Sequence, residues 1–273
     1  VIIDIDERSL DELKQEFGRW PWPRETLAAV LEWVNHQGAQ AVVFDILFAD
    51  ADTLNPASDA AFADAVSASK NTYFPVLRLH PDNDPISQVR TDQLPGFASR
   101  STVAAATPAP TVAVVPPVFD AVVRSERLGY HNIYADDDGV NRFYRLWEDK
   151  QGWQLWSLPA RLAIDLQWPL PDHPKSLIQF TKHQDAYLRV PFSTIWKLSQ
   201  TREGLKADPR FKDAIVIIGA TATSLFDVKV TPIATTHPGV MVLANVIDNL
   251  KQQRFLRQVP GWVQVVIAWL GLL

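Results

Sequence analysis

The chain has 273 residues, of which 47% are hydrophobic, which is enough apolar material for one large domain or two ordinary ones. Its formal net charge of −5 argues against a nucleic-acid-binding protein, which normally presents a basic face. Because the chain has no cysteine, disulfide scaffolds, thiol catalysis and cysteine-based zinc sites are excluded.

The first 48 residues predict a strand, a proline-rich turn, a helix and a second strand. The apolar run 1–5 is interrupted only by Asp4, and the run 41–48 only by Asp45. Strands that are apolar on both faces are typical of a parallel sheet covered by helices. The segment 24–38 between them repeats apolar residues at helical spacing and fits a right-handed crossover. We therefore predict an α/β fold with a mainly parallel sheet flanked by helices, in which these two strands are neighbours.

A second helix at about 58–69 and a third strand at 72–79 follow. Pro75 lies inside that strand, and because proline lacks a backbone donor it predicts a sheet edge or a break in pairing. Residues 80–118 are rich in proline, serine, threonine and alanine without periodicity. We expect them to form an irregular excursion over the surface.

After a short helix at 118–125, two aromatic-rich runs flank the acidic segment 136–139, which predicts a β-hairpin with a tight turn. The alternative for this segment is a calcium loop, but the EF-hand spacing and its closing glutamate are absent. The remaining predicted elements are a helix at 152–166, a strand at 177–180, a helix at 191–198, a strand at 213–222 and a helix at 239–250.

The last stretch, 259–273, is uncharged and predominantly apolar. A membrane-spanning helix needs about 20 such residues, so we expect the start of a truncated transmembrane helix, with Trp262 at the interface. A terminal core helix is the alternative. The predicted organisation is therefore one domain at 1–258, containing the excursion at 80–118, followed by the beginning of a span at 259–273.

The candidate site is a convergence of acidic residues at the ends of the predicted strands. Ligands of open α/β sheets bind outside the carboxyl ends of the strands, and Gly219 in the strand 213–222 permits close backbone approach there. The candidate ligand-binding residues are Asp4, Asp6, Trp22, Arg24, Asp45, Thr221 and Asp227.

Unpaired carboxylates in one apolar site repel each other, which leaves several arrangements open. The group formed by Asp4, Asp6 and Asp45 either binds a divalent cation, pairs with Arg24, or forms a buried hydrogen-bonded network. Trp22 either packs against the sheet or stacks on a ligand. The chain lacks the glycine-rich nucleotide fingerprints and the HExxH motif, so we assign no catalytic residue.

Several motifs in order along residues 2–250 resemble the CHASE2 domain. They are IDIDERSL, RWPWPRETLA, GAQAVVFDILF, SDAAFADAV, LGYHNIYADDDGVNRFYRL, SLPARLA, IVIIGATATSLFDVKVTPI and PGVMVLANVIDNL. The WPWPR turn followed by FDILF is the most specific pair. One departure is the run Met-Val-Leu before Ala244, where the family often has a histidine.

The resemblance implies a sensory domain at the front of bacterial adenylate or guanylate cyclases, histidine kinases or serine/threonine kinases. Such a domain lies outside the cytoplasmic membrane, in the periplasm, and has no catalysis of its own. We further expect a small ligand or periplasmic partner, a membrane attachment through the C-terminal span, and a homodimer. A periplasmic assembly module without a ligand is the alternative. The helix 239–250 is the expected signal lever, because no linker separates it from the predicted span.

Overall fold

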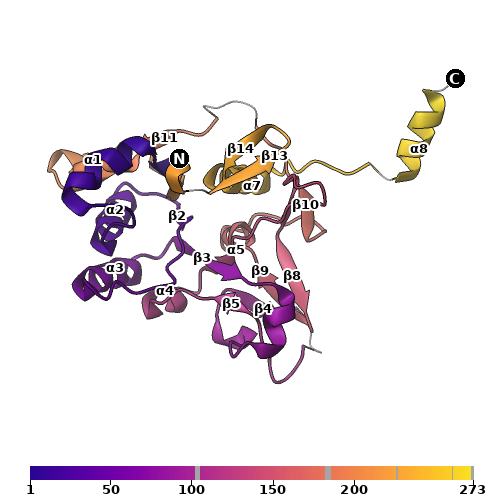
Figure 1. The fold of residues 1–273 in the computed structure, drawn as a ribbon, viewed down its shortest axis with the longest axis horizontal. Coiled ribbons are helices and arrows are strands. Elements are labelled where there is room, and N and C mark those ends of the chain that lie inside the picture. The colour runs from indigo at the N-terminus through magenta and orange to yellow at the C-terminus, as the bar shows by residue number, and fades with distance from the viewer. Residues whose placement is uncertain (102–104, 182–185, 226, 260, 272–273) are drawn as a thin grey trace.

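The computed structural model describes residues 1–101, 105–181, 186–225, 227–259 and 261–271. Figure 1 shows α1 to α4 along one side of the main sheet, and α5 and α7 on the other. The helices are α1 (Glu7–Phe17), α2 (Arg24–His36), α3 (Pro56–Ala68), α4 (Asp120–Arg124), α5 (Leu158–Asp165), α6 (Phe192–Ser199), α7 (Gly239–Gln252) and α8 (Gly261–Leu270). The 3-10 turns are η1 (Pro81–Ile86), η2 (Thr91–Gln93), η3 (Glu203–Leu205) and η4 (Thr223–Leu225).

The main sheet has the strand order β11-β1-β12-β2-β3-β5, and β6 also pairs with β3. Its pairings are parallel except that of β3 with β5, so the predicted α/β class is confirmed. Its strands are β1 (Ile2–Ile5), β2 (Ala41–Phe44), β3 (Thr72–Arg78), β5 (Val114–Val115), β6 (Leu128–Tyr130), β11 (Arg189–Pro191) and β12 (Ile215–Ala220). Smaller sheets join β4 (Ala98–Arg100), β9 (Trp153–Trp156) and β8 (Trp147–Lys150), join β7 (Phe143–Arg145) to β10 (Lys175–Leu177), and join β13 (Val228–Thr231) to β14 (Ala234–Pro238).

Alternation along the strands divides the core into two layers. Ile3 and Ile5 face the layer of α1, α2, α3 and α6, whereas Ile2 and Val43 face α5 and α7. Strands buried on both sides in this way account for the unbroken apolar runs in the sequence. The first layer holds an aromatic cluster around Phe48, which packs against Phe44, Phe62, Phe74 and Phe119.

The prediction that the first two strands are adjacent in the sheet is wrong. β12 lies between β1 and β2 and pairs in parallel with both. The pattern of β1 and β2 is the same whether they pair directly or through a third apolar strand, so the sequence could not separate the two arrangements. The predicted break at Pro75 occurs on one side of the strand only, because β2 pairs with β3 as far as Tyr73, whereas β6 pairs with β3 through Pro75.

Two local predictions were wrong because short strands replace the expected element. The hairpin around 136–139 does not form, since β6 joins β3 while β7 pairs with β10. The turn itself is present, with the Gly139 N–H donating to the Asp136 carbonyl at 2.8 Å. The first part of the predicted helix 152–166 is β9, and α5 begins only after Ser157, whose hydroxyl accepts the Ala160 N–H.

Helix α1 was not predicted, because its sequence is mostly polar and only Ser9 and Leu13 are buried. Asp6 begins it as the N-cap, its Oδ1 accepting the Ser9 N–H at 2.7 Å. A carboxylate in this position satisfies one of the free N–H groups at a helix start. The expected helices at 24–38, 58–69, 191–198 and 239–250 are confirmed as α2, α3, α6 and α7.

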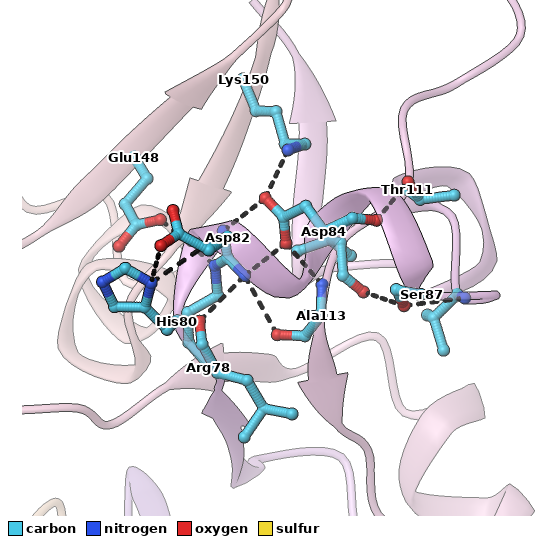
Figure 2. Close-up of polar contacts among 12 residues, drawn as sticks. Arg78, His80, Asp82, Asp84, Ser87, Thr111, Ala113, Glu148 and Lys150 are labelled. Atoms are coloured by element: carbon cyan, nitrogen blue, oxygen red, sulfur yellow. Dashed lines mark hydrogen bonds and ion pairs between the residues drawn. The ribbon is translucent and has the colours of Figure 1, made fainter.

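The excursion 80–118, outside its undescribed residues 102–104, contains η1, η2, β4 and β5 and is held by a buried ion-pair network (Figure 2). Arg78 forms a two-pronged contact with Asp84, from Nη1 to Oδ1 at 2.7 Å and from Nη2 to Oδ2 at 2.9 Å. Lys150 also donates to Asp84, and Glu148 accepts from Arg78 Nε at 3.3 Å. The network therefore ties η1 to β3 and to β8.

The C-terminal part differs from the predicted direct connection of helix to span. Gln253 ends α7 in a left-handed conformation, and Leu256 then bonds to Leu177 of β10 before α8 begins. Figure 1 shows α8 standing away from the rest of the chain. In the described residues no helix is long and apolar enough to cross a membrane, while residues 260 and 272–273 of the predicted span lie outside the description.

Candidate functional site

Three side-chain positions form a row at the carboxyl ends of β1, β12 and β2. Asp4 is opposite Gly219, and the parallel register of β12 with β2 continues to place Gly219 beside Asp45. By strand alternation, all three lie on the face that packs against α7. Adjacent strands are about 4.8 Å apart, so the backbones of Asp4 and Asp45 are separated by about 10 Å.

Gly219 is required at the centre of this row. A Cβ atom there would lie 2.8 Å from Val240 Cγ2 and 2.9 Å from Asp45 Cβ. Any side chain would therefore push α7 away from the sheet or displace Asp45. The glycine allows the start of α7 to approach the sheet closely on this face.

A pocket of about 390 Å³ opens beside the row. Its walls combine the ends of β2, β3 and β12 with the segment after β6, the start of β13 and one side of α7. The lining residues are Asp45, Leu47, Leu77, His131, Asn132, Ile133, Tyr144, Ala220, Asp227, Lys229, Gly239 and Leu243. This location is the one where open α/β sheets bind ligands.

The charged groups of the pocket have few partners. The Asp45 side chain is 8% exposed, and its Oδ1 lies 3.4 Å from His131 Nδ1, which is beyond an ordinary hydrogen-bond distance. Asp227 and Lys229 form an ion pair at 2.9 Å and are more exposed. The side-chain amide of Asn132 is hydrogen-bonded to the backbone of Arg78: its Oδ1 accepts the Arg78 N–H, and its Nδ2 donates to the Arg78 carbonyl.

Tyr144 also lines this pocket, and its hydroxyl is an unused polar group. The residue is 1% exposed, and its hydroxyl has no hydrogen-bond partner within the described chain. Burial, with a smaller contribution from the Asp45 charge, raises the pKa of Tyr144 far above its ordinary value. The hydroxyl is therefore neutral and free both to donate and to accept a hydrogen bond, at a cost in desolvation of about 1–3 kcal/mol.

A protein-family model described as the CHASE2 domain matches residues 1–273, the whole chain. The chain belongs to the CHASE2 family. CHASE2 is a sensory family rather than a catalytic one, and its domains are extracytoplasmic. Nothing among curated proteins and nothing among solved structures matches this chain.

Within the CHASE2 domain, the pocket brings together two of the residues predicted to bind a ligand, Asp45 and Asp227. The Asp4 carboxylate already accepts two hydrogen bonds from Thr221. The Thr221 N–H donates to Oδ1 at 3.1 Å, and the Thr221 hydroxyl donates to Oδ2 at 2.8 Å. Burial raises the pKa of Asp4 above its ordinary value, and the Thr221 hydrogen bonds partly offset that effect. Asp4 and Thr221 thus match the hydrogen-bonded network that was the alternative to ligand binding.

Two further residues predicted to bind a ligand, Trp22 and Arg24, lie in the opposite layer of the domain. Trp22 is 2% exposed and packs against Trp20 and Phe192, as the packing alternative predicted. The Arg24 guanidinium lies over the Phe48 ring, 5.4 Å from its centroid. The ion pairs of the described residues do not join Arg24 to Asp4, Asp6 or Asp45.

The predicted metal ligands do not form one group. Asp4 bonds Thr221, Asp6 caps α1, and Asp45 faces His131. Throughout the described ranges there is no set of three or more His, Asp or Glu side chains that could hold a metal ion. A divalent cation therefore remains a prediction, and the geometry favours a buried network at Asp4.

Four polar residues that line the pocket were missed by motif reasoning: His131, Asn132, Tyr144 and Lys229. His131, Asn132 and Tyr144 lie in the run that was expected to fold as a hairpin, which would have placed them on a surface ribbon. Lys229 lies in the stretch after Gly219, where no motif singled it out. The one sequence feature that could have pointed to these residues is that they lie in the segments that resemble the family.

His237, on the strand that leads into α7, predicts a pH dependence of stability. It is 7% exposed, its Nδ1 lies 3.0 Å from the Thr231 hydroxyl, and burial lowers its pKa. Because the unfolded chain, with a histidine pKa of about 6.5, then binds the proton more readily, stability is present above that pH and falls as pH decreases through it. We expect His237→Gln to reduce this loss between pH 7.5 and 5.5, measured by urea unfolding.

The matched control for this experiment is His80→Gln. The His80 side chain is 72% exposed, so its replacement is expected to leave the pH dependence of the native chain unchanged. An unaltered pH dependence in His237→Gln would contradict the assignment to His237.

Proposed function

We propose that this CHASE2 domain is the signal-input module of a bacterial membrane receptor. It would lie on the periplasmic side of the cytoplasmic membrane and report a small ligand or periplasmic partner to a cytoplasmic cyclase or kinase. Family membership supports the sensory role. The observation that carries ligand binding is the pocket at the carboxyl ends of the strands, because its wall includes the first residue of α7.

The contacts of α7 support its role in passing on the signal. At its start, the Gly239 N–H donates to the Asp227 carbonyl at 2.9 Å, and a Cβ at Gly239 would lie 2.0 Å from Asp227 Oδ2. A ligand that moves Asp227 therefore acts directly on the start of the helix. Ligands shift a conformational equilibrium only by the difference in their affinity for the two states, so the proposal requires a ligand that binds one position of Asp227 and of the start of α7 more tightly than another.

The far half of α7 is held to the segment after β10 by two asparagines. Asn249 bonds the N–H and the carbonyl of Gln179, and Asn245 accepts the Thr181 N–H at 2.9 Å. The chain after α7 then contacts β10 through Leu256. A shift of α7 would thus reach α8 through β10 and this bridge, and not along one continuous helix. A homodimer of the domain remains a prediction.

The test is ligand-dependent thermal unfolding of the 273-residue chain with a panel of amino acids, amines, sugars, organic acids and divalent cations. Saturation at 100 times the dissociation constant stabilises by about 2.7 kcal/mol. For a chain of this size that corresponds to a rise of roughly 5–10 °C in the midpoint. Leu47→Trp, which places a large ring in the pocket, is expected to abolish the response.

Leu54→Trp is the matched control, because Leu54 is 96% exposed and lies seven residues further along the same chain segment. It should retain the ligand response of the native chain. The proposal is wrong if no compound of the panel stabilises the chain, or if Leu47→Trp responds as the native chain does.

A further inference from the structure

We propose that the pocket at the end of β2 recognises a protonated amine carried on a small aliphatic molecule. The Asp45 carboxylate and the Tyr144 hydroxyl are the two groups that would hold the ammonium. This inference rests on the proposed function, because it names the ligand class of the same pocket.

The first observation is an incompletely compensated negative charge inside the pocket. Asp45 is 92% buried as a side chain, and its only described polar side-chain contact is the long one to His131. Asp227 and Lys229 neutralise each other nearer the surface. Apart from His131, the lining therefore carries two carboxylates, Asp45 and Asp227, against one ammonium group, that of Lys229. A buried carboxylate without a close partner is costly, and an incoming cation removes that cost.

The second, independent observation is the hydroxyl of Tyr144. The residue lines the same pocket, and its buried hydroxyl lacks a hydrogen-bond partner in the described chain. An ammonium group has three N–H donors, so it can donate to a carboxylate oxygen and to this hydroxyl oxygen at once. A ligand carboxylate or phosphate would accept from the hydroxyl, but Asp45 would repel it.

The apolar residues of the lining favour an aliphatic chain as the remainder of the ligand. Leu47, Leu77, Ile133 and Leu243 give the pocket an aliphatic wall, and the volume is about 390 Å³. Pockets of 300–1,000 Å³ with an apolar lining and a few polar groups are typical of small-molecule sites. A divalent cation is a poorer fit, because calcium takes six to eight oxygen ligands and magnesium requires an octahedral set.

The experiment uses three probes with the same aliphatic chain and different head groups: n-butylammonium, 1-butanol and butyrate. Binding to the 273-residue chain is followed by saturation-transfer NMR, which detects weak ligands. We expect n-butylammonium to bind at least tenfold more tightly than the neutral and the anionic probe. Asp45→Asn should weaken its binding about tenfold or more, as the loss of a charge-assisted hydrogen bond predicts.

Tyr144→Phe is the second variant, because it removes only a hydroxyl that has no partner in the folded chain and should fold normally. We expect it to weaken n-butylammonium binding several-fold. Asp120→Asn, at an 89% exposed carboxylate outside the pocket, is the control and should bind as the native chain does. L-norleucine, tested alongside, separates a simple amine from an α-amino acid, since only the latter also carries a carboxylate.

Equal affinity for 1-butanol, tighter binding of butyrate, or unchanged binding in Asp45→Asn would overturn amine recognition. If a neutral or anionic probe binds and Leu47→Trp blocks it, the pocket remains the ligand site and only the amine assignment fails. If no probe binds, amine recognition is overturned, while the wider panel with Leu47→Trp still decides the proposed function.

Discussion

Replacing Asp84 by alanine is expected to lower the free energy of unfolding by about 3–5 kcal/mol, because it removes the two-pronged partner of a buried arginine and leaves only the longer contact with Glu148. Arg78 and Asp84 are each only 4% exposed, and Asp84 also accepts from Lys150 and from the Ala113 N–H (Figure 2). The thermal midpoint should fall by roughly 6–20 °C in a chain of this size.

The pH dependence of the same variant follows from the network. Burial alone would raise the pKa of Asp84, but the hydrogen bonds from Arg78, Lys150 and Ala113 outweigh it and hold the pKa below its ordinary value. Stability from this group is therefore present above the unfolded carboxyl pKa of about 3.9 and is lost as pH falls through the folded pKa. The difference between the native chain and Asp84→Ala should be largest near neutral pH and shrink in acid.

Asp82→Ala is the matched control, since Asp82 lies two residues away on the same 3-10 turn with its side chain 88% exposed. Its replacement should change the midpoint little, as is usual for exposed ion pairs. Similar midpoints for Asp82→Ala and Asp84→Ala would show that the network does not anchor this segment.

Phe48→Ala is expected to cost about 3–5 kcal/mol, the usual range for removing a buried aromatic ring. Phe48 is 1% exposed, and the centroid of its ring lies 4.7 Å from that of Phe62. The Arg24 guanidinium also packs over the Phe48 ring. The truncation opens a void among the rings of the first layer, where α3 and α4 pack. Equilibrium unfolding in urea measures the loss.

Leu54→Ala, six residues further on and 96% exposed, is the control and should unfold like the native chain. A loss below about 1 kcal/mol in Phe48→Ala would contradict a tightly packed cluster, because it would mean that the neighbouring rings collapse into the space. Circular dichroism in the native state would establish that the variant is folded before unfolding is measured.

The sequence was sufficient for the elements whose pattern is set locally. Helices α2, α3, α6 and α7 and strand β12 were predicted close to their observed bounds, because apolar spacing and proline or glycine positions determine them. The order of the strands in the sheet could not be predicted from the sequence. The position of β12 between β1 and β2 depends on tertiary packing and does not alter the hydrophobic periodicity of any of the three strands. Short strands such as β9 were lost for the same reason, as they depend on partners far away in the chain.

The same limit applies to the candidate site. Asp4 and Asp45 were predicted to converge because their strands were expected to be neighbours, and the intervening strand places them about 10 Å apart. Asp45 was correctly placed at the carboxyl end of its strand, but Tyr144 was not predicted, because β7 pairs outside the main sheet. The residue pattern of a strand predicts at which of its ends a ligand binds. The residues that complete the pocket from other elements, such as Tyr144 of β7, depend on the topology of the fold.

The central position of β12 also has a consequence for how the chain is made. Strands β1 and β2 are complete within the first 44 residues, yet their shared partner begins only at residue 215. During synthesis, both strands therefore expose unpaired edges until most of the chain has emerged, which is the condition that favours aggregation. Contacts of such long sequence separation also slow folding. This domain is expected to depend on holding chaperones during its biogenesis, and an N-terminal fragment that stops before residue 215 should fail to form its central sheet.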